Sequence, residues 1–177
     1  IVESYYRDYQ DHPKTFRPIF LVNDILRFWK TLCLNYEHKR NQPTDDLDKK
    51  RKQKIKNFKL KFSRMMTCFA TVAILSSHRE PVLKEQVIEI AKITPRQRLE
   101  KVAEVLPSTR SNVDALINEY AWFLEKTGLS EHDLHDFFRE KRNRTVAFDR
   151  AGKFGDLMFD LLKAADSETG NLRYLVI

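Results

Sequence analysis

Few side chains in this sequence have the types and spacing that catalysis requires. Asp46 and Asp48 show the D-x-D spacing with which carboxylates hold two metal ions for phosphoryl transfer. Such carboxylates must converge from rigid elements, whereas these two stand in a polar loop before a basic helix, so we interpret them as an N-terminal helix cap. The motifs G-x-G-x-x-G, G-x-x-x-x-G-K-S/T, H-E-x-x-H and G-x-S-x-G do not occur in the sequence. The sequence therefore predicts a domain without a complete catalytic site.

Two histidine patterns also allow a chemical interpretation. The run His-Asp-Leu-His-Asp at 132–136 could bind a divalent metal, but the capping box that begins at Ser130 explains its acids better. Arg7 and His12 form an R-x4-H pair, and some helical ribonucleases cleave RNA with an Arg and a His at this spacing. A pair this simple arises often by chance, and here it runs into Pro13. We therefore expect neither a metal centre nor a nuclease site.

A crowded row of cations is the strongest signal in the sequence. Residues 49–64 contain nine Lys and Arg and no acid. On one helix these side chains repel one another, which costs stability unless an anionic partner relieves it. The cations flank an apolar stripe, with Lys52, Lys56 and Lys59 on one side and Lys50, Lys54, Lys61 and Arg64 on the other. A phosphate chain or an acidic partner would suit this surface, and an ordinary solvated face is the alternative.

The helix expected directly before this one carries a mixed polar stripe. Asn23, Asp24, Arg27, Lys30 and Glu37 combine charges of both signs with an amide. Arg27 and Lys30 could hold a phosphate or a carboxylate while Asp24 orients Arg27 from three residues away. The alternative is an ordinary solvated face with one ion pair.

The spacing of apolar residues predicts an all-α fold, a helical bundle of about seven or eight helices. Hydrophobic residues make up 42% of the chain, while 4 Gly and 6 Pro are too few for a turn-rich β architecture. We expect a basic helical subdomain at 1–80 with a long central helix and a second helical subdomain at 81–177 packed on it, or else one single domain. The expected helices are the end of one at 1–10 and others at about 19–40, 48–78, 83–92, 94–105, 111–127, from 130 onward and at about 143–165.

Charge and cysteine usage indicate the surroundings of the protein. The net charge of +7 is uneven, because residues 1–66 hold 16 Lys and Arg against 8 Asp and Glu, whereas residues 67–177 hold 16 against 17. This asymmetry predicts an anionic partner for the first third. Cys33 and Cys68 sit in apolar helical patterns and should be reduced core residues. With no signal peptide and no run of 18 apolar residues, we expect a cytoplasmic protein without a membrane partner, and the start at Ile1 indicates a fragment.

Three longer runs carry a resemblance to a known family. They are Phe16–Arg40, Lys59–Phe69 and Tyr120–Lys126. Together they resemble the helical C-terminal region of bacterial nucleotidyltransferase-like proteins of the DNA polymerase β superfamily, over most of the chain. In such proteins the catalytic domain lies N-terminal and carries a Gly-Ser at a helix start, followed by an Asp-x-Asp on a strand that binds two metals. No glycine here is followed by Ser, so this chain departs from the full pattern by lacking the catalytic half.

The resemblance implies an accessory role. The chain would be a substrate-binding or regulatory helical domain that closes over a nucleotide or an acceptor, with its partner an N-terminal nucleotidyltransferase domain of the same parent chain. It would need no cofactor itself, and Mg²⁺ and NTP are expected only with the missing catalytic domain. By fold-level analogy the residues that face the cleft between the halves would be Asp24, Arg27, Lys30, Tyr36, Glu37, Lys59, Lys61 and Arg64.

Two alternatives remain open. The first is a free-standing nucleic-acid-binding module built on the basic helix, although Phe58 and Phe62 lie on the buried stripe and leave no obvious aromatic ring for base stacking. The second is a protein-interaction scaffold that docks through the apolar tail Leu172–Ile177. The sequence therefore predicts a binding domain for a nucleotide, a nucleic acid or a protein.

Overall fold

The most apolar stretch of the sequence becomes the central helix of the protein. In a computed structural model, which describes residues 2–175, helix α3 spans Met65–Ser77 and is buried on nearly all sides. It packs against α5, α8 and α1, so three neighbouring helices cover it. A helix that is apolar all round requires such an environment.

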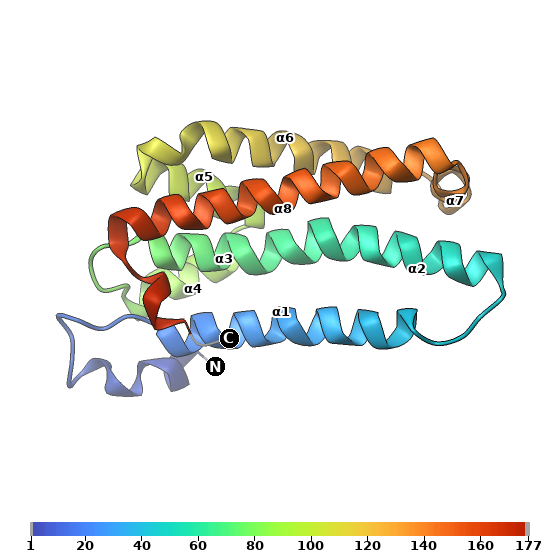
Figure 1. Cartoon of the computed structure of the whole chain (residues 1–177). Coiled ribbons are helices and arrows are strands. Elements are labelled where there is room, and N and C mark those ends of the chain that lie inside the picture. The colour runs from blue at the N-terminus through green and yellow to red at the C-terminus, as the bar shows by residue number, and fades with distance from the viewer. Residues whose placement is uncertain (1, 176–177) are drawn as a thin grey trace.

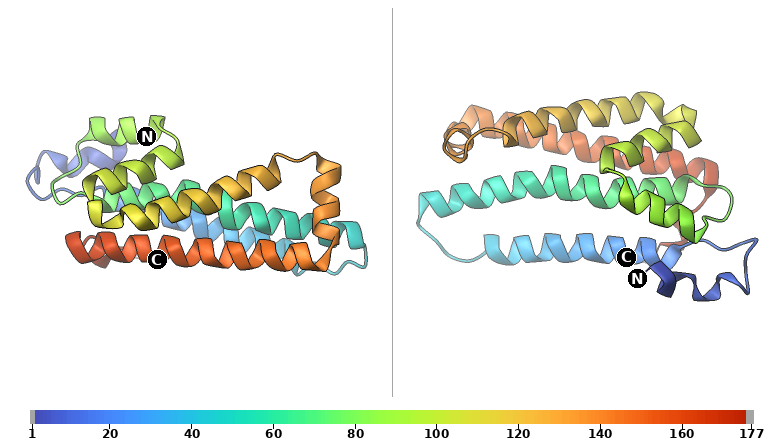
Figure 2. Two further views of the ribbon diagram at one scale, coloured as in Figure 1. Left: turned by 90° about the horizontal axis from the view of Figure 1, so that it is seen from above. Right: turned by 180° about the vertical axis from the view of Figure 1, so that it is seen from behind.

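All-α architecture is confirmed for the described residues, which contain eight α-helices and no strand. The α-helices α1, α6 and α8 and the continuous rod of α2 and α3 run side by side along an elongated bundle (Figure 1). Seen from above and behind, α4 and α5 cover one end of this bundle and α7 lies across the other end (Figure 2). The elements are the 3-10 helix η1 Val2–Tyr9, α1 Ile19–Arg40, α2 Leu47–Lys59, the π-helical turn η2 Leu60–Arg64, α3 Met65–Ser77, α4 Lys84–Lys92, α5 Pro95–Val105, the 3-10 turn η3 Pro107–Thr109, α6 Arg110–Thr127, α7 Glu131–Arg139, α8 Lys141–Thr169 and the 3-10 turn η4 Leu172–Tyr174.

The expected long helix over 48–78 forms with one irregularity. It consists of α2, η2 and α3, and the amide of Met65 bonds back to the carbonyl of Leu60, which adds one residue to that turn. Phe62 lies inside the π-helical turn and is fully buried. No periodicity in the sequence indicated this insertion.

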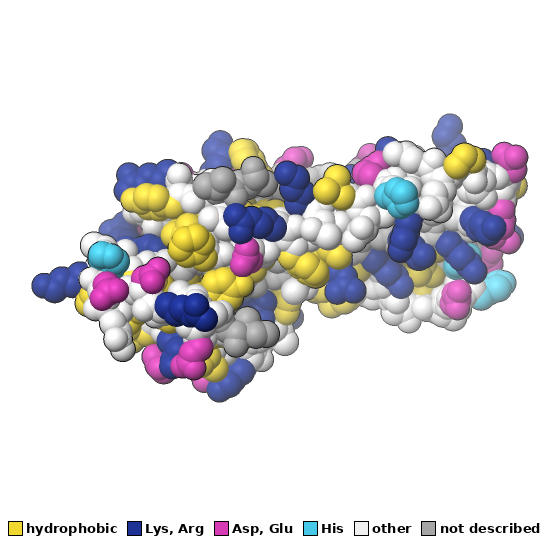
Figure 3. Space-filling model, turned by 90° about the horizontal axis from the view of Figure 1, so that it is seen from below, with side chains coloured by type: hydrophobic (Ala, Val, Ile, Leu, Met, Phe, Trp, Pro, Cys, Tyr) yellow, Lys and Arg dark blue, Asp and Glu magenta, His cyan; other side chains and the backbone are white. Residues whose placement is uncertain are grey.

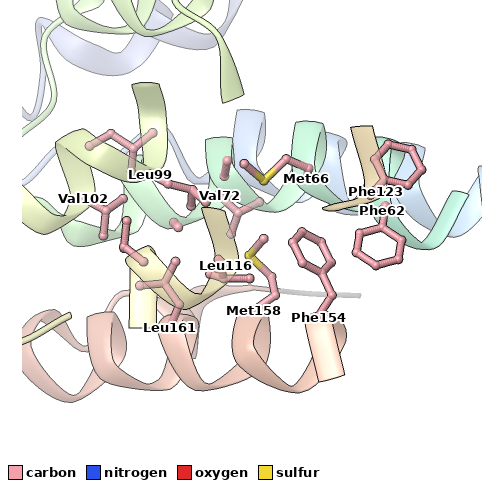
Figure 4. Packing of buried hydrophobic residues seen from close by; sticks show 14 of the residues in the cluster. Phe62, Met66, Val72, Leu99, Val102, Leu116, Phe123, Phe154, Met158 and Leu161 are labelled. Atoms are coloured by element: carbon pink, nitrogen blue, oxygen red, sulfur yellow. The ribbon is translucent and has the colours of Figure 1, made fainter. Parts of the chain in front are cut away.

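An aromatic cluster holds the first part of this rod. Phe62 stacks on Phe123 of α6 with ring centroids 4.9 Å apart and contacts Phe154 of α8 at 4.8 Å. Phe58 lies one turn earlier and meets Phe138 of α7 at 5.3 Å. Figure 4 shows how Phe62, Phe123 and Phe154 continue into the aliphatic core. Such pairs add about 0.5–1.5 kcal/mol each beyond the burial of their area.

Buried residues on both sides of residue 80 belong to one hydrophobic cluster. Phe62 and Met66 from the first part contact the same core as Leu116 and Leu161 from the second part. The hydrophobic core is therefore continuous across residue 80. The division of the chain into two subdomains at that point stays a prediction.

Capping residues begin two of the helices, and the cap predicted at Ser130 is confirmed. Thr94 accepts a hydrogen bond from the Gln97 amide at 3.3 Å and precedes Pro95, which begins α5. Ser130 accepts from the Asp133 amide at 3.1 Å and begins α7. The last helix is longer than predicted and ends only at Gly170, whose φ of +64° places it in the left-handed region that favours glycine.

The N-terminal residues differ from the predicted helix end. Residues Val2–Tyr9 form a 3-10 helix, and the backbone leaves helical geometry at Tyr6, with φ −113° and ψ 15°. Tyr6 is buried, and its hydroxyl donates to the carbonyl of Val82 at 2.6 Å. The hydrogen bond from Tyr6 to Val82 thus accompanies a departure from regular α-helical geometry.

The C-terminal segment fastens α8 to the end of α3. The side-chain amide of buried Asn171 donates to the carbonyls of Ser76 and His78 at 2.9 and 3.0 Å. Leu175 packs against the hydrophobic core. Of the tail proposed for docking, residues 176 and 177 lie outside the described residues. No helix among residues 2–175 combines the length and the apolar character that a membrane span requires.

A buried carboxylate connects α6 to α8. Glu119 has a side chain only 6% exposed, and it accepts from Arg150 Nε at 2.7 Å and from Lys153 Nζ at 2.9 Å. Arg150 also lies over the ring of Trp122 at 4.3 Å. Burial acts to raise the pKa of Glu119, but the hydrogen bonds and charges of Arg150 and Lys153 outweigh it and leave the pKa below its ordinary value.

Replacing Glu119 by Ala should destabilise the protein. The substitution leaves two cations without their partner, and we expect the free energy of unfolding to fall by about 2–3 kcal/mol, less than for a fully buried pair because Lys153 retains water. Chemical denaturation measures this change. Glu125→Ala is the control, because Glu125 pairs with Lys126 at the surface, and it should cost less than about 0.5 kcal/mol. Equal losses in the two variants would contradict the structural role of Glu119.

The same carboxylate should make stability depend on acidity. Because its pKa is lower in the folded protein than its ordinary 4.5, its contribution is complete above that value and is lost as the pH falls through the folded-state pKa. In Glu119→Gln this contribution is absent. The difference in unfolding free energy between wild type and Glu119→Gln should therefore shrink from about pH 6 to about pH 3, and a constant difference would refute the assignment.

Candidate functional site

A helical hairpin carries a basic surface, because α1 ends and α2 begins with clusters of Lys and Arg. Helix α1 ends at Arg40, a polar loop follows, and α2 begins at Leu47 and runs back along α1 (Figure 1). The side-chain amide of Gln53 donates to the carbonyl of Lys39 at 3.1 Å and ties the two helices together. This antiparallel pairing brings the cations at the end of α1 beside those at the start of α2.

Two pockets flank the contact between these helices. They share Tyr36 and Gln53, and each is enclosed by one basic flank of α2. We call the first the lysine pocket, of about 490 Å³, lined by Tyr36, His38, Lys39, Gln42, Lys49, Lys52, Gln53 and Lys56. We call the second the aromatic pocket, of about 350 Å³, lined by Tyr36, Arg40, Lys50, Gln53, Lys54, Asn57 and Phe148.

A third pocket continues the surface onto α8. This α8 pocket has a volume of about 400 Å³ and shares Lys54 and Phe148 with the aromatic pocket. Its further lining residues are Lys141, Arg144, Thr145 and Asp149. The three pockets form what we call the basic surface, which crosses α1, α2 and α8.

Charge on the flanks of α2 is poorly compensated, although Glu37 pairs with Arg40 and Asp149 lines the α8 pocket. No carboxylate lines the lysine pocket or the aromatic pocket. Within residues 49–64, ion pairs to described carboxylates join Arg51 to Asp48 at 2.7 Å and Lys49 to Asp46 at 4.0 Å, both at the helix start. Seen from below α1, Lys and Arg side chains lie along the whole face, and those at this end of the molecule are accompanied by some Asp and Glu (Figure 3). The flanks of α2 therefore present positive charge to any ligand in the pockets.

Tyr36 stands between the two pockets and is partly buried. Burial raises the pKa of its hydroxyl above the ordinary value of 10, while nearby Arg40 acts in the opposite direction. The phenol is therefore neutral at physiological pH and can donate or accept a hydrogen bond.

The structure places the predicted residues Asp24 and Arg27 at the other end of α1. Asp24 accepts from Arg27 at 2.7 Å, as the predicted pairing requires, and also from the Tyr5 hydroxyl at 2.9 Å. The bonds from Tyr5 and then Arg27 lower the pKa of Asp24. About 18 Å of helix separates Asp24 from Tyr36, at 1.5 Å per residue. This pair does not belong to the basic surface.

The remaining predicted residues do not line the two α1–α2 pockets. Lys30 is exposed on the middle of α1, and Glu37 pairs with Arg40 at 2.8 Å. Lys59 ends α2, while Lys61 and Arg64 belong to the π-helical turn. Of the eight predicted residues, Tyr36 lines both pockets.

Several residues of the basic surface were not among those predicted. Four lysines were predicted to lie on the basic flanks but not in the site: Lys50, Lys52, Lys54 and Lys56. The polar loop at 41–46 could have indicated that they lie beside the end of α1, because it reverses the direction of the chain. Phe148, Lys141 and Arg144 arrive from α8, almost a hundred residues later. No local pattern could have placed them here.

The short motifs have structural explanations. Asp46 caps α2, because its carboxylate accepts from the amides of Asp48 and Lys49 at 2.9 and 3.1 Å, which confirms the predicted cap. His132 lies 3.4 Å from Asp136 on the exposed start of α7. Among residues 2–175 no group of three or more His, Cys, Asp or Glu side chains is arranged to hold a metal ion.

The structure also places the Arg7–His12 pair that was considered for RNA cleavage and the two cysteines. Arg7 and His12 line neighbouring hollows near the N-terminus that share Tyr5 and Phe20. Cys33 is partly exposed and Cys68 is buried, and both are free thiols whose pKa is raised by burial.

Asp46→Ala should loosen the start of α2. The amides of Asp48 and Lys49 lose their acceptor, and we expect their hydrogen exchange to accelerate roughly three- to tenfold. Asp46→Asn supplies a comparable acceptor and should leave exchange near the wild-type rate. Exchange measured by NMR distinguishes the two variants, and equal protection in both would show that Asp46 does not cap α2.

The comparisons with known proteins leave this geometry as the basis for assigning a function. No protein-family model matches the chain, and no curated protein or solved structure shows significant similarity to it.

Proposed function

We propose that this chain is a binding domain that holds a phosphate-bearing ligand on the basic surface. The main support is the pair of pockets on either side of Tyr36 and Gln53, which cations from two helices line without any carboxylate. Phosphate groups are recognised by such clusters of Lys and Arg. A ligand in both pockets would contact both basic flanks of α2.

The energetics of α2 support the same proposal. Like charges one turn apart, such as Lys50 with Lys54 and Lys52 with Lys56, each cost about 0.2–0.5 kcal/mol. A bound polyanion removes this repulsion and releases its own counterions, so binding gains from both effects. An apolar or neutral ligand would gain from neither.

Within a longer parent chain, the proposed role is that of the accessory helical half of a nucleotidyltransferase. This role rests on the family resemblance of Phe16–Arg40, Lys59–Phe69 and Tyr120–Lys126. The catalytic half would supply Mg²⁺ and NTP, and the basic surface would hold the nucleotide or the acceptor. Expression together with the residues that precede Ile1 in the gene, followed by an assay of nucleotide transfer, tests the role. An upstream sequence without a Gly-Ser and Asp-x-Asp domain would rule it out.

A free-standing nucleic-acid-binding module is the second candidate. The observation that favours it is the extent of the basic surface, which continues from the lysine pocket through the aromatic pocket to the α8 pocket. A single nucleotide occupies one pocket, whereas a strand can occupy several. Titration with ATP and with a 12-nucleotide RNA separates the candidates, since the module requires the RNA to bind much more tightly.

Binding to a phosphodiester strand should depend strongly on salt. Fluorescence anisotropy with labelled RNA should show log K falling linearly with log salt concentration, by roughly 0.7 per phosphate neutralised. Lys52→Gln/Lys56→Gln removes two cations of the lysine pocket and should reduce this slope by up to about 1.4 and the affinity at low salt about tenfold.

Lys92→Gln/Lys101→Gln provides the matched control, because these lysines are exposed at the opposite end of the molecule. The control changes net charge equally and should keep nearly all of the affinity. Equal weakening by the two double variants would indicate attraction by net charge alone and would contradict a localised site.

A further inference from the structure

The aromatic pocket has a composition that phosphate binding alone does not require. Two of its lining residues, Tyr36 and Phe148, are aromatic, and two others, Gln53 and Asn57, carry amides. Cations surround these four residues from α1 and α2. A site for phosphate alone needs donors and positive charge, so the rings and the amides indicate an additional chemical group.

The ring of Phe148 is held in place by contacts outside the pocket, and Tyr36 is partly buried. Phe148 packs against the hydrophobic core and meets Phe138 edge-on with centroids 6.4 Å apart, yet it remains partly exposed and lines two pockets. Tyr36 is partly buried between the helices of the hairpin. A ring that is already ordered loses little conformational freedom when a flat ligand stacks on it.

The amides suit the edge of a base. Gln53 uses its NH2 group to bond Lys39 at 3.1 Å, which orients its side chain at the pocket. The side chain of Asn57 makes no hydrogen bond to the described residues and can offer both a donor and an acceptor. Asn and Gln side chains recognise bases in this way, and unpaired bases expose the edges that they need.

Continuity with the neighbouring pockets indicates a strand and not a single nucleotide. The aromatic pocket shares Tyr36 and Gln53 with the lysine pocket on one side, and Lys54 and Phe148 with the α8 pocket on the other. Cations therefore continue in both directions from the rings, and in the α8 pocket Lys54, Lys141 and Arg144 outnumber the single carboxylate of Asp149. In a duplex the bases are paired and stacked, so they are not available to such a pocket.

We infer that the aromatic pocket takes an unpaired base of a single-stranded nucleic acid, with Tyr36 and Phe148 as its stacking surfaces. The phosphates on either side of this base lie in the lysine pocket and the α8 pocket. The inference rests on the proposed function and specifies its ligand. The aromatic rings that the basic helix itself could not provide, because Phe58 and Phe62 are buried, come instead from α1 and α8.

The experiment compares three labelled strands of one length by fluorescence anisotropy at low salt. These are a single-stranded RNA, an abasic phosphodiester strand and an RNA duplex. The single strand should bind about tenfold more tightly than the abasic strand. Phe148→Leu and Tyr36→Leu should each weaken single-strand binding about tenfold, within the range for a lost base–aromatic stack, and leave abasic binding unchanged.

Phe148→Trp and Tyr36→Phe are the matched controls, because they retain a ring and should retain the affinity. Thermal denaturation verifies that each variant is folded, and the quenching of 2-aminopurine in the wild-type complex reports stacking directly. If the Leu variants bind the single strand like the wild type, or if the duplex or the abasic strand binds as tightly as the single strand, the base-stacking inference is wrong while the proposed function stands. If the wild type binds none of the three strands, the inference fails, and if it does not bind ATP either, the proposed function fails with it.

Discussion

Burial of the apolar stripe on α2 is the interaction on which the basic surface depends. Ile55, Phe58 and Phe62 are nearly or fully buried against α6, α7 and α8, and full burial of such a side chain contributes about 1.5–3 kcal/mol. The repulsion between lysines one turn apart costs about 0.2–0.5 kcal/mol per pair. Burial therefore exceeds repulsion, so the helix can hold its crowded cations without a carboxylate beside each one.

The same burial decides where the cations lie. With one face of α2 turned to the aromatic cluster, its lysines are confined to two flanks. Tyr36 of α1 and Gln53 of α2 line both of the pockets that these flanks enclose. The hairpin thus separates the charge into two pockets. Helix α8 then lies beside one of them, because the contact of Phe62 with Phe154 fixes its position along the rod. The packing of α2 against α6, α7 and α8 therefore determines both the core and the position of the pockets on the surface.

The sequence predicted the elements better than the site. Periodicity and the Ser130 cap located most helices within a few residues, because these signals are local. The stripe on α1 was also correct in its pairing of Asp24 with Arg27. The meeting of distant residues was not predictable. Phe148 and Tyr36 line one pocket only because α8 packs on α2. The π-helical turn at Leu60–Arg64 also changes the register of the rod at a point where the apolar pattern is continuous.

The positions of the acids explain why the flanks stay positive. A helix start favours negative charge, because its free amides and its macrodipole are positive there. Asp46 and Asp48 meet this requirement in the first turn of α2, where they bond the amides and Arg51. Acids placed further along the helix could have paired with Lys52, Lys54 and Lys56 one turn away and relieved their repulsion. None occurs between Lys49 and Arg64. The stabilising acids are thus confined to the start of α2, and its basic flanks remain open to the negative charge of a ligand.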